Sequence, residues 1–155
     1  MLQQALAIFL EMLAVAHIAL SADERLAPGY FRDPDWSVKD LVAHLGAWLT
    51  EAATQLTTIA ARSYVPHDLD VDARNAETLA AMRDEPWEAV WAQASEGRAY
   101  MLEHWFALRL QSDAANQWVR KAGAEHYGEH LGPLRAWVAE LIDVRTRPPS
   151  DEWDS

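Results

Sequence analysis

The sequence predicts an all-α protein, a single four-helix bundle, and three observations carry this prediction. Apolar residues recur at spacings of three and four along four long segments, which is the period of an amphipathic helix. No segment shows the alternation of a β-strand, and there is no glycine-rich phosphate loop or internal repeat. A long loop separates the second helix from the third, and four helices of this kind bury their apolar faces best as a bundle.

The first helix covers residues 2–20 and is apolar on more than one side. Glu11, His17 and the lack of a basic start argue against a secretory signal, and the apolar run is too short to span a membrane. Its second apolar flank predicts contact with another subunit, and so a homodimer; the alternative is a central helix covered by its own domain. One apolar line runs along it: Leu2, Leu6, Phe9, Leu13, Ala16 and Leu20.

Ser37 is the predicted start of the second helix, after a loop marked by Pro28, Gly29 and Pro34. Serine is a favourable N-cap, and Asp40 three residues later places a carboxylate in the first turn. The helix is expected to fray at residues 63–66. Its core stripe contains Leu41, Leu45, Trp48, Ala52, Leu56 and Ile59.

The third and fourth helices follow the long loop. Asp70 or a neighbour caps a short segment, and Pro86 restarts the helix, because proline is tolerated in a first turn. This helix continues to about residue 108, and the fourth runs from about residue 113 to 145. Residues 1–145 then form one domain, and the acidic residues 146–155 form a flexible tail.

Composition and charge limit the partners of the chain. With 155 residues, half of them hydrophobic, it has the size of one domain with a real core. A net charge of −11 argues against binding nucleic acid and gives no attraction to anionic membranes. The absence of cysteine excludes disulfides, thiolate metal sites and a cysteine nucleophile, and it is consistent with the cytoplasm.

Two histidines in the fourth helix are the first sign of chemistry. His126 and His130 are four residues apart in the apolar stripe, so they lie one turn apart on one face. That spacing lets both imidazoles bind one divalent metal ion. The alternative is that each histidine forms a hydrogen bond to a neighbouring helix, and the spacing leaves both interpretations open.

His44, at the edge of the stripe of the second helix, would complete a set of three histidines. Taken alone it is a structural histidine; with the pair it becomes a third metal ligand. Asp40 or Glu51 is a candidate to orient its second ring nitrogen, as carboxylates do around metal sites. The alternative roles are a charge at the helix N-terminus for Asp40 and a solvated face for Glu51. Further candidates near the site, without an assigned role, are His17, Asn75, Tyr127 and Glu129.

Three segments together resemble the DinB-like superfamily, which includes the metal-binding domain of mycothiol-dependent maleylpyruvate isomerase and the ClbS/DfsB-type proteins. The family pattern W-[ST]-V-[RK]-D-x-[VL]-x-H-L is similar to residues 36–45, WSVKDLVAHL. Its D-x-x-N-A pattern is similar to residues 72–76, DARNA, and its H-Y-x-E-H-[LI] pattern to residues 126–131, HYGEHL. The motifs occur in order across nearly the whole chain.

The resemblance implies a four-helix bundle of up-up-down-down order that holds a divalent metal ion, zinc or nickel. Matched residue by residue, the implied ligands are His44, His126 and His130. Relatives make thiol transfer or thiol-dependent isomerisation the leading reaction, on a small molecule and with a low-molecular-weight thiol. The alternative hypothesis is a non-enzymatic protein that binds a small toxic molecule in stress or self-resistance, with an empty or structural histidine site.

Overall fold

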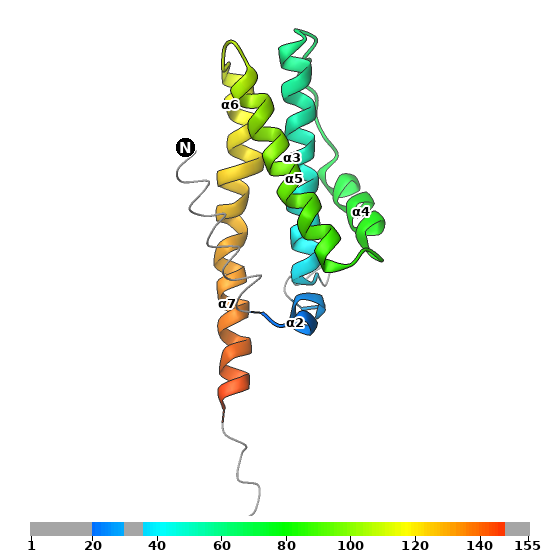
Figure 1. The fold of residues 1–155 in the computed structure, drawn as a ribbon, viewed down its shortest axis with the longest axis vertical. Coiled ribbons are helices and arrows are strands. Elements are labelled where there is room, and N and C mark those ends of the chain that lie inside the picture. The colour runs from blue at the N-terminus through cyan, green and yellow to red at the C-terminus, as the bar shows by residue number, and fades with distance from the viewer. Residues whose placement is uncertain (1–19, 30–35, 148–155) are drawn as a thin grey trace, which may run out of the picture.

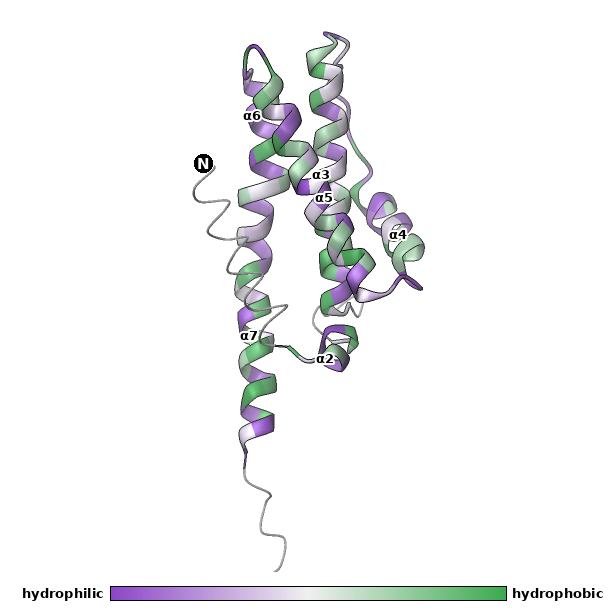
Figure 2. Cartoon of the chain, in the orientation of Figure 1, coloured by the Kyte–Doolittle hydropathy of each residue, from purple (hydrophilic) through white to green (hydrophobic). Residues whose placement is uncertain are grey.

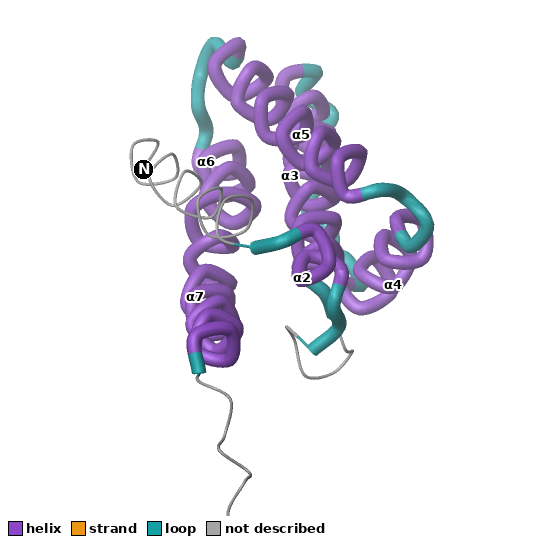
Figure 3. The backbone as a smooth tube through the Cα atoms, turned by 60° about the horizontal axis from the view of Figure 1, so that its bottom comes forward, coloured by secondary structure: helices purple, strands orange, loops and turns teal. Residues whose placement is uncertain are grey.

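The structure is a computed structural model, and it describes residues 20–29 and 36–147. Its regular elements are all helical and these two ranges contain no strand, so the prediction of an all-α protein is confirmed (Figures 1 and 3). The elements are α2 (Ala22–Leu26), α3 (Val38–Ala60), α4 (Val71–Met82), α5 (Trp87–Ala107), α6 (Asp113–Arg120), the π-helical turn η2 (Lys121–Glu125) and α7 (His126–Thr146).

The start of α3 is fixed by a capping box, as the sequence predicts. Ser37 Oγ accepts a hydrogen bond from the Asp40 backbone N–H at 3.2 Å. In return, the Ser37 N–H donates to Asp40 Oδ2 at 2.8 Å. Two of the backbone donors that a helix start leaves unpaired are thereby satisfied.

Packing of α3 against α5 forms the apolar centre of the described residues. The two helices approach closely through glycine: a Cβ atom added to Gly46 would lie 3.0 Å from the Ala94 Cα atom. A Cβ atom on Gly97 would lie 3.2 Å from the Gly46 carbonyl oxygen. Around this contact, α3 contributes the fully buried side chains Leu41, Leu49, Ala52 and Leu56.

The predicted break between the short third segment and its continuation is also found. Asp70 caps α4 by accepting from the Ala73 N–H at 3.0 Å, and Pro86 is the N-cap residue of α5. The turn between them is held to α3 by the buried Lys39, whose Nζ donates to the Arg83 carbonyl at 2.8 Å and the Glu85 carbonyl at 2.7 Å.

The predicted fourth helix is present as the continuous run α6–η2–α7, from Asp113 to Thr146. Ser112 caps its start, where its hydroxyl accepts from the Ala115 N–H at 3.3 Å. The π-helical turn η2 within it was not predicted. In Figure 1 this run is the long yellow-to-red helix, and Figure 2 shows hydrophobic and hydrophilic residues alternating around it.

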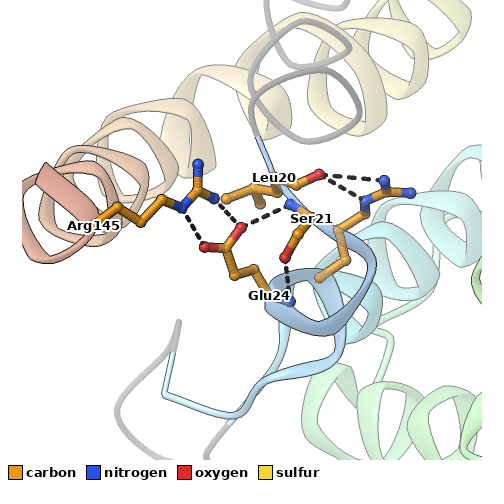
Figure 4. A network of polar contacts seen from close by, with 5 residues as sticks. Leu20, Ser21, Glu24 and Arg145 are labelled. Carbon is orange, nitrogen blue, oxygen red and sulfur yellow. Dashed lines mark hydrogen bonds and ion pairs between the residues drawn. The ribbon is translucent and has the colours of Figure 1, made fainter.

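A polar network ties α2 to the C-terminal end of α7 (Figure 4). Arg145 Nε donates to Glu24 Oε1 at 2.7 Å, and its Nη2 contacts Glu24 Oε2. The same carboxylate accepts from the Ser21 N–H at 2.7 Å, which closes the capping box of α2. The Arg145 side chain, together with the bond from Ser21, lowers the pKa of Glu24 to about 2.

The first predicted helix, residues 2–20, lies outside the described residues except for Leu20, and so does His17. The four-helix arrangement and the homodimer therefore stay predictions, and so does the tail from residue 148. Within the described ranges, no helix combines the length and apolar character needed to cross a bilayer.

Candidate metal centre

The fold brings His44, His126 and His130 together. His44 comes from the second turn of α3, and the other two come from the first two turns of α7. One ring nitrogen of each lies within 4.8 Å of the others. His44 and His130 are buried, with 6% and 9% of their surface exposed, and His126 is half-buried. Residues 82 positions apart in the chain thus form one cluster at the meeting of two helices.

Asn75 from α4 fixes the tautomer of His44. Its Oδ1 atom lies 2.9 Å from His44 Nδ1 and also accepts from Trp48 Nε1–H at 3.2 Å. An indole N–H only donates, which identifies this amide atom as the oxygen. An oxygen only accepts, so His44 Nδ1 carries the ring proton. The lone pair of His44 is therefore on Nε2, the atom that faces His126.

A hydrogen bond of 2.7 Å joins His44 Nε2 to His126 Nε2. Because His44 Nε2 is the acceptor, His126 Nε2 donates in the metal-free protein. The rings are packed edge to face, with centroids 4.6 Å apart, and the His130 ring lies 5.3 Å from His44 and 5.1 Å from His126. The three rings thus form a compact group whose nitrogens converge on one place.

Burial keeps all three histidines neutral at pH 7. Desolvation, with a contribution from the neighbouring His130, lowers the pKa of His44 to about 4. Desolvation and the other two rings lower the pKa of His126 to about 3, and desolvation lowers the pKa of His130. A histidine binds a metal ion only when it is neutral, so these low values suit the cluster to metal binding.

The π-helical turn η2 ends directly before His126 and sets the direction of its side chain. Residues four apart on an α-helix rotate away from one another by about 40° per step, because a turn has about 3.6 residues. A π-turn, closed by bonds from residue i to i+5, removes part of this rotation. One cavity is accordingly lined by four residues that follow each other at intervals of four positions: Trp118, Ala122, His126 and His130.

The three histidines open onto a cavity of about 620 Å³. Its walls come from α3, from the segment between α3 and α4, and from the α6–η2–α7 run. Trp48, which was predicted to be core, lies in this wall, and so do Trp118, Tyr64 and His67. Trp48 and Trp118 could not be recognised as wall residues from sequence, because a tryptophan at helical spacing has the same pattern in a core as in a pocket wall. Tyr64 and His67 lie between α3 and α4, where helical spacing predicts nothing about their contacts.

The two candidate partners of His44 are bonded elsewhere, and for Asp40 this is the alternative role at the helix start. Asp40 accepts from both Ser37 groups, N–H and hydroxyl, at 2.8 Å each. Glu51 accepts from Gln55 at 2.7 Å and pairs with Arg74 at 2.9 Å. Neither carboxylate orients His44, because Asp40 is bonded to Ser37 at the start of α3 and Glu51 forms an ion pair with Arg74 of α4. The amide of Asn75 takes this role instead.

Of the two remaining candidates in the described residues, one lines the cavity and the other does not. Glu129 is exposed and lines the same cavity as the histidines. Tyr127 is 3% exposed and is absent from the cavity wall, and burial raises its pKa. Consecutive residues of a helix point about 100° apart, so the residue next to His126 faces the apolar interior instead. His104, away from the cluster, contacts the Tyr100 carbonyl through Nδ1 at 2.8 Å.

Comparisons of the chain with protein-family models, with curated proteins and with solved structures found no match. What stands is an all-helical protein with a buried cluster of three histidines that could hold a metal ion.

Proposed function

We propose that this chain is a DinB-like protein that binds one divalent metal ion, zinc or nickel, through His44, His126 and His130. The carrying observation is the convergence of three buried ring nitrogens within 4.8 Å of one another. The tautomer of His44, fixed through Asn75, supports it, because an unprotonated Nε2 faces His126. The finer fold in this proposal is an up-up-down-down bundle completed by residues 2–20.

Three neutral imidazoles would leave the ion its full charge and an open position for a small molecule. When bound, such an ion supplies Lewis acidity, which lowers the pKa of a water or thiol that binds to it. The chain's own residues hold the imidazoles in place, with Asn75 and Trp48 fixing the ring of His44. The cavity beside them gives a small molecule access.

The proposed activity is that of a metal-dependent thiol transferase or thiol-dependent isomerase, with a hydrolase as the related alternative. The chain has no cysteine, so a thiol at the ion must come from a low-molecular-weight thiol. The three-histidine group includes no carboxylate ligand among the described residues, which supports an open position. The protein would act in the cytoplasm, on a small molecule.

Elemental analysis of untagged protein tests the proposal, since an affinity tag could load nickel by itself. We expect about one zinc or nickel ion per chain in the wild type. His126→Ala and His44→Ala should lose it, whereas the control His104→Ala should keep it, because His104 lies outside the cluster. Wild-type protein without stoichiometric metal, or metal content unchanged in His126→Ala, would contradict the proposal.

A second candidate function rests on the 2.7 Å hydrogen bond between His44 and His126. Buried polar groups that satisfy one another can be purely structural. The protein would then be a non-enzymatic small-molecule-binding or stress protein. It would bind a ligand stoichiometrically and turn over none of a panel of thiols and electrophiles, with or without added zinc.

A further inference from the structure

The cavity beside the three histidines changes in character from one end to the other. His44 and His130 are buried, whereas Asp68, Lys121 and Glu129, which line the same cavity, are exposed. One end is therefore the histidine cluster and the other faces solvent. The volume of about 620 Å³ lies within the range of sites that enclose a small molecule.

Two tryptophans contribute aromatic surface to the wall of this cavity. Trp48 and Trp118 are half-buried and line the cavity from α3 and α6. Their polar N–H groups are already used: Trp48 Nε1 donates to Asn75 Oδ1 at 3.2 Å, and Trp118 Nε1 to the Tyr64 hydroxyl at 3.3 Å. The walls therefore offer a ligand apolar ring surface held in a fixed orientation, and such surface suits a flat aromatic group.

The solvent end carries more negative than positive charge. Asp68 and Glu129 are carboxylates, and among the residues that the structure describes Lys121 is the one ammonium group in the cavity wall. The chain as a whole has a net charge of −11, which adds to the negative potential around this end. An anionic group at the outer end of a ligand would meet repulsion there.

From these three features we propose that the cavity binds a flat aromatic molecule with a metal-coordinating group at one end and a neutral or cationic group at the other. This inference rests on the proposed function, because the histidine end holds the ligand through the metal ion. It goes further by naming the ligand class and assigning Trp118, Asp68 and Glu129 the roles that select it.

Calorimetric titration of the zinc-loaded chain with two hydroxamates tests the aromatic wall. Acetohydroxamate and benzohydroxamate share one metal-binding group and differ by a phenyl ring. We expect benzohydroxamate to bind at least about tenfold more tightly, since its ring buries apolar surface against the tryptophans. Trp118→Ala should lose this gain and keep the affinity for acetohydroxamate, which also reports that the variant is folded. Trp118→Phe should restore part of the gain.

The control for this titration is Trp91→Ala. Trp91 is also half-buried but stacks on Trp87, with ring centroids 5.5 Å apart, and does not line the cavity. The preference for benzohydroxamate should survive this change. Equal affinities of the wild type for both hydroxamates, or a preference that persists in Trp118→Ala, would overturn the inference.

A second pair of ligands tests the charge selection. The wild type should bind 4-(aminomethyl)benzohydroxamate more tightly than 4-carboxybenzohydroxamate, by about three- to tenfold at low salt. Asp68→Asn with Glu129→Gln should bring the two affinities together. Tighter binding of the carboxylate would refute the selection. Metal content is measured first: protein without zinc rejects the proposed function itself, whereas zinc-loaded protein without an aromatic preference rejects only this inference.

Discussion

Helix α3 takes part in two regions of opposite character. In the α3–α5 contact, a Cβ atom on Gly46 would lie only 3.0 Å from the Ala94 backbone, and the surrounding core is apolar apart from Thr50. In the histidine cluster, His44 meets Asn75 and His126 through hydrogen bonds in a place that excludes most water. The first region depends mainly on close packing, whereas the second depends on which polar group is bonded to which partner.

Of these two regions, the histidine cluster is the one whose stability should depend on pH. His44 has a pKa of about 4 in the folded protein, below its ordinary value of 6.5. As the pH falls, His44 therefore binds a proton in the unfolded chain at a higher pH than in the folded protein. Its contribution to the free energy of unfolding is fully present above pH 6.5 and is lost as the pH falls towards 4. We expect about 3 kcal/mol of loss from His44 alone in the metal-free protein.

Urea unfolding of metal-free protein between pH 7 and 4 measures this loss. His44→Gln should flatten the pH dependence of the free energy of unfolding, and the half-buried His104, which lies outside the cluster, provides the matched control, His104→Gln. If the free energy of unfolding changed equally with pH in the wild type, His44→Gln and His104→Gln, the histidine cluster would not be the cause of the acid sensitivity.

Removing the partner of His44 should weaken metal binding without breaking the fold. Asn75→Ala takes away the acceptor of His44 Nδ1–H and of Trp48 Nε1–H. Loss of such an outer partner lowers metal affinity by about 10–100-fold, which competition with a chromophoric chelator measures.

Asn116→Ala is the matched control for this experiment, because Asn116 Oδ1 likewise accepts from a tryptophan, Trp105, at 3.0 Å. It lies outside the cluster, so zinc affinity should stay unchanged. Equal losses in the two variants would mean that Asn75 acts only through general stability.

The α3–α5 contact should be sensitive to one added methyl group. Gly46→Ala places a carbon 3.0 Å from the Ala94 backbone, so the helices must separate, at a cost of about 2 kcal/mol. Gly128→Ala has nothing within 4 Å and should stabilise α7 by about 0.5–1 kcal/mol. Thermal unfolding compares the two variants, and a stable Gly46→Ala protein would show that the contact is loose.

The smallest expected effect lies far from both regions, where Arg145 holds Glu24. Glu24→Gln should lower the melting temperature slightly, because exposed ion pairs contribute little. The difference from the wild type should disappear at about 1 M salt, where such pairs are screened. A difference that persists in high salt would indicate that Glu24 acts through its capping bond to Ser21.

Local chemistry made much of this fold predictable from sequence. Ser37, Asp70 and Pro86 mark helix starts because a cap is decided by a few neighbouring residues. The spacing of His126 and His130 likewise predicts that they share a face, which the structure bears out. Their meeting with His44 was predicted from the pair together with the DinB-like motif.

Other features depend on contacts between helices and could not be predicted from one segment. The π-turn before His126 has no recognisable marker in residues 121–125, so it could not be predicted from them. Asp40 was given two roles, and only the folded chain shows that its own helix start occupies it. Asn75 was a candidate near the site without an assigned role, and its bond to His44 requires the position of α4.

X-ray absorption at the metal edge of untagged protein tests the central claim most directly, because it reports the ligands of the ion as well as its presence. The account predicts a signal of about three imidazole nitrogens at about 2.0–2.1 Å, with additional light-atom ligands in the open position. His126→Ala should lower the imidazole count or lose the ion. A bound metal without imidazole scattering, or with a signal unchanged in His126→Ala, would contradict the claim that His44, His126 and His130 hold it.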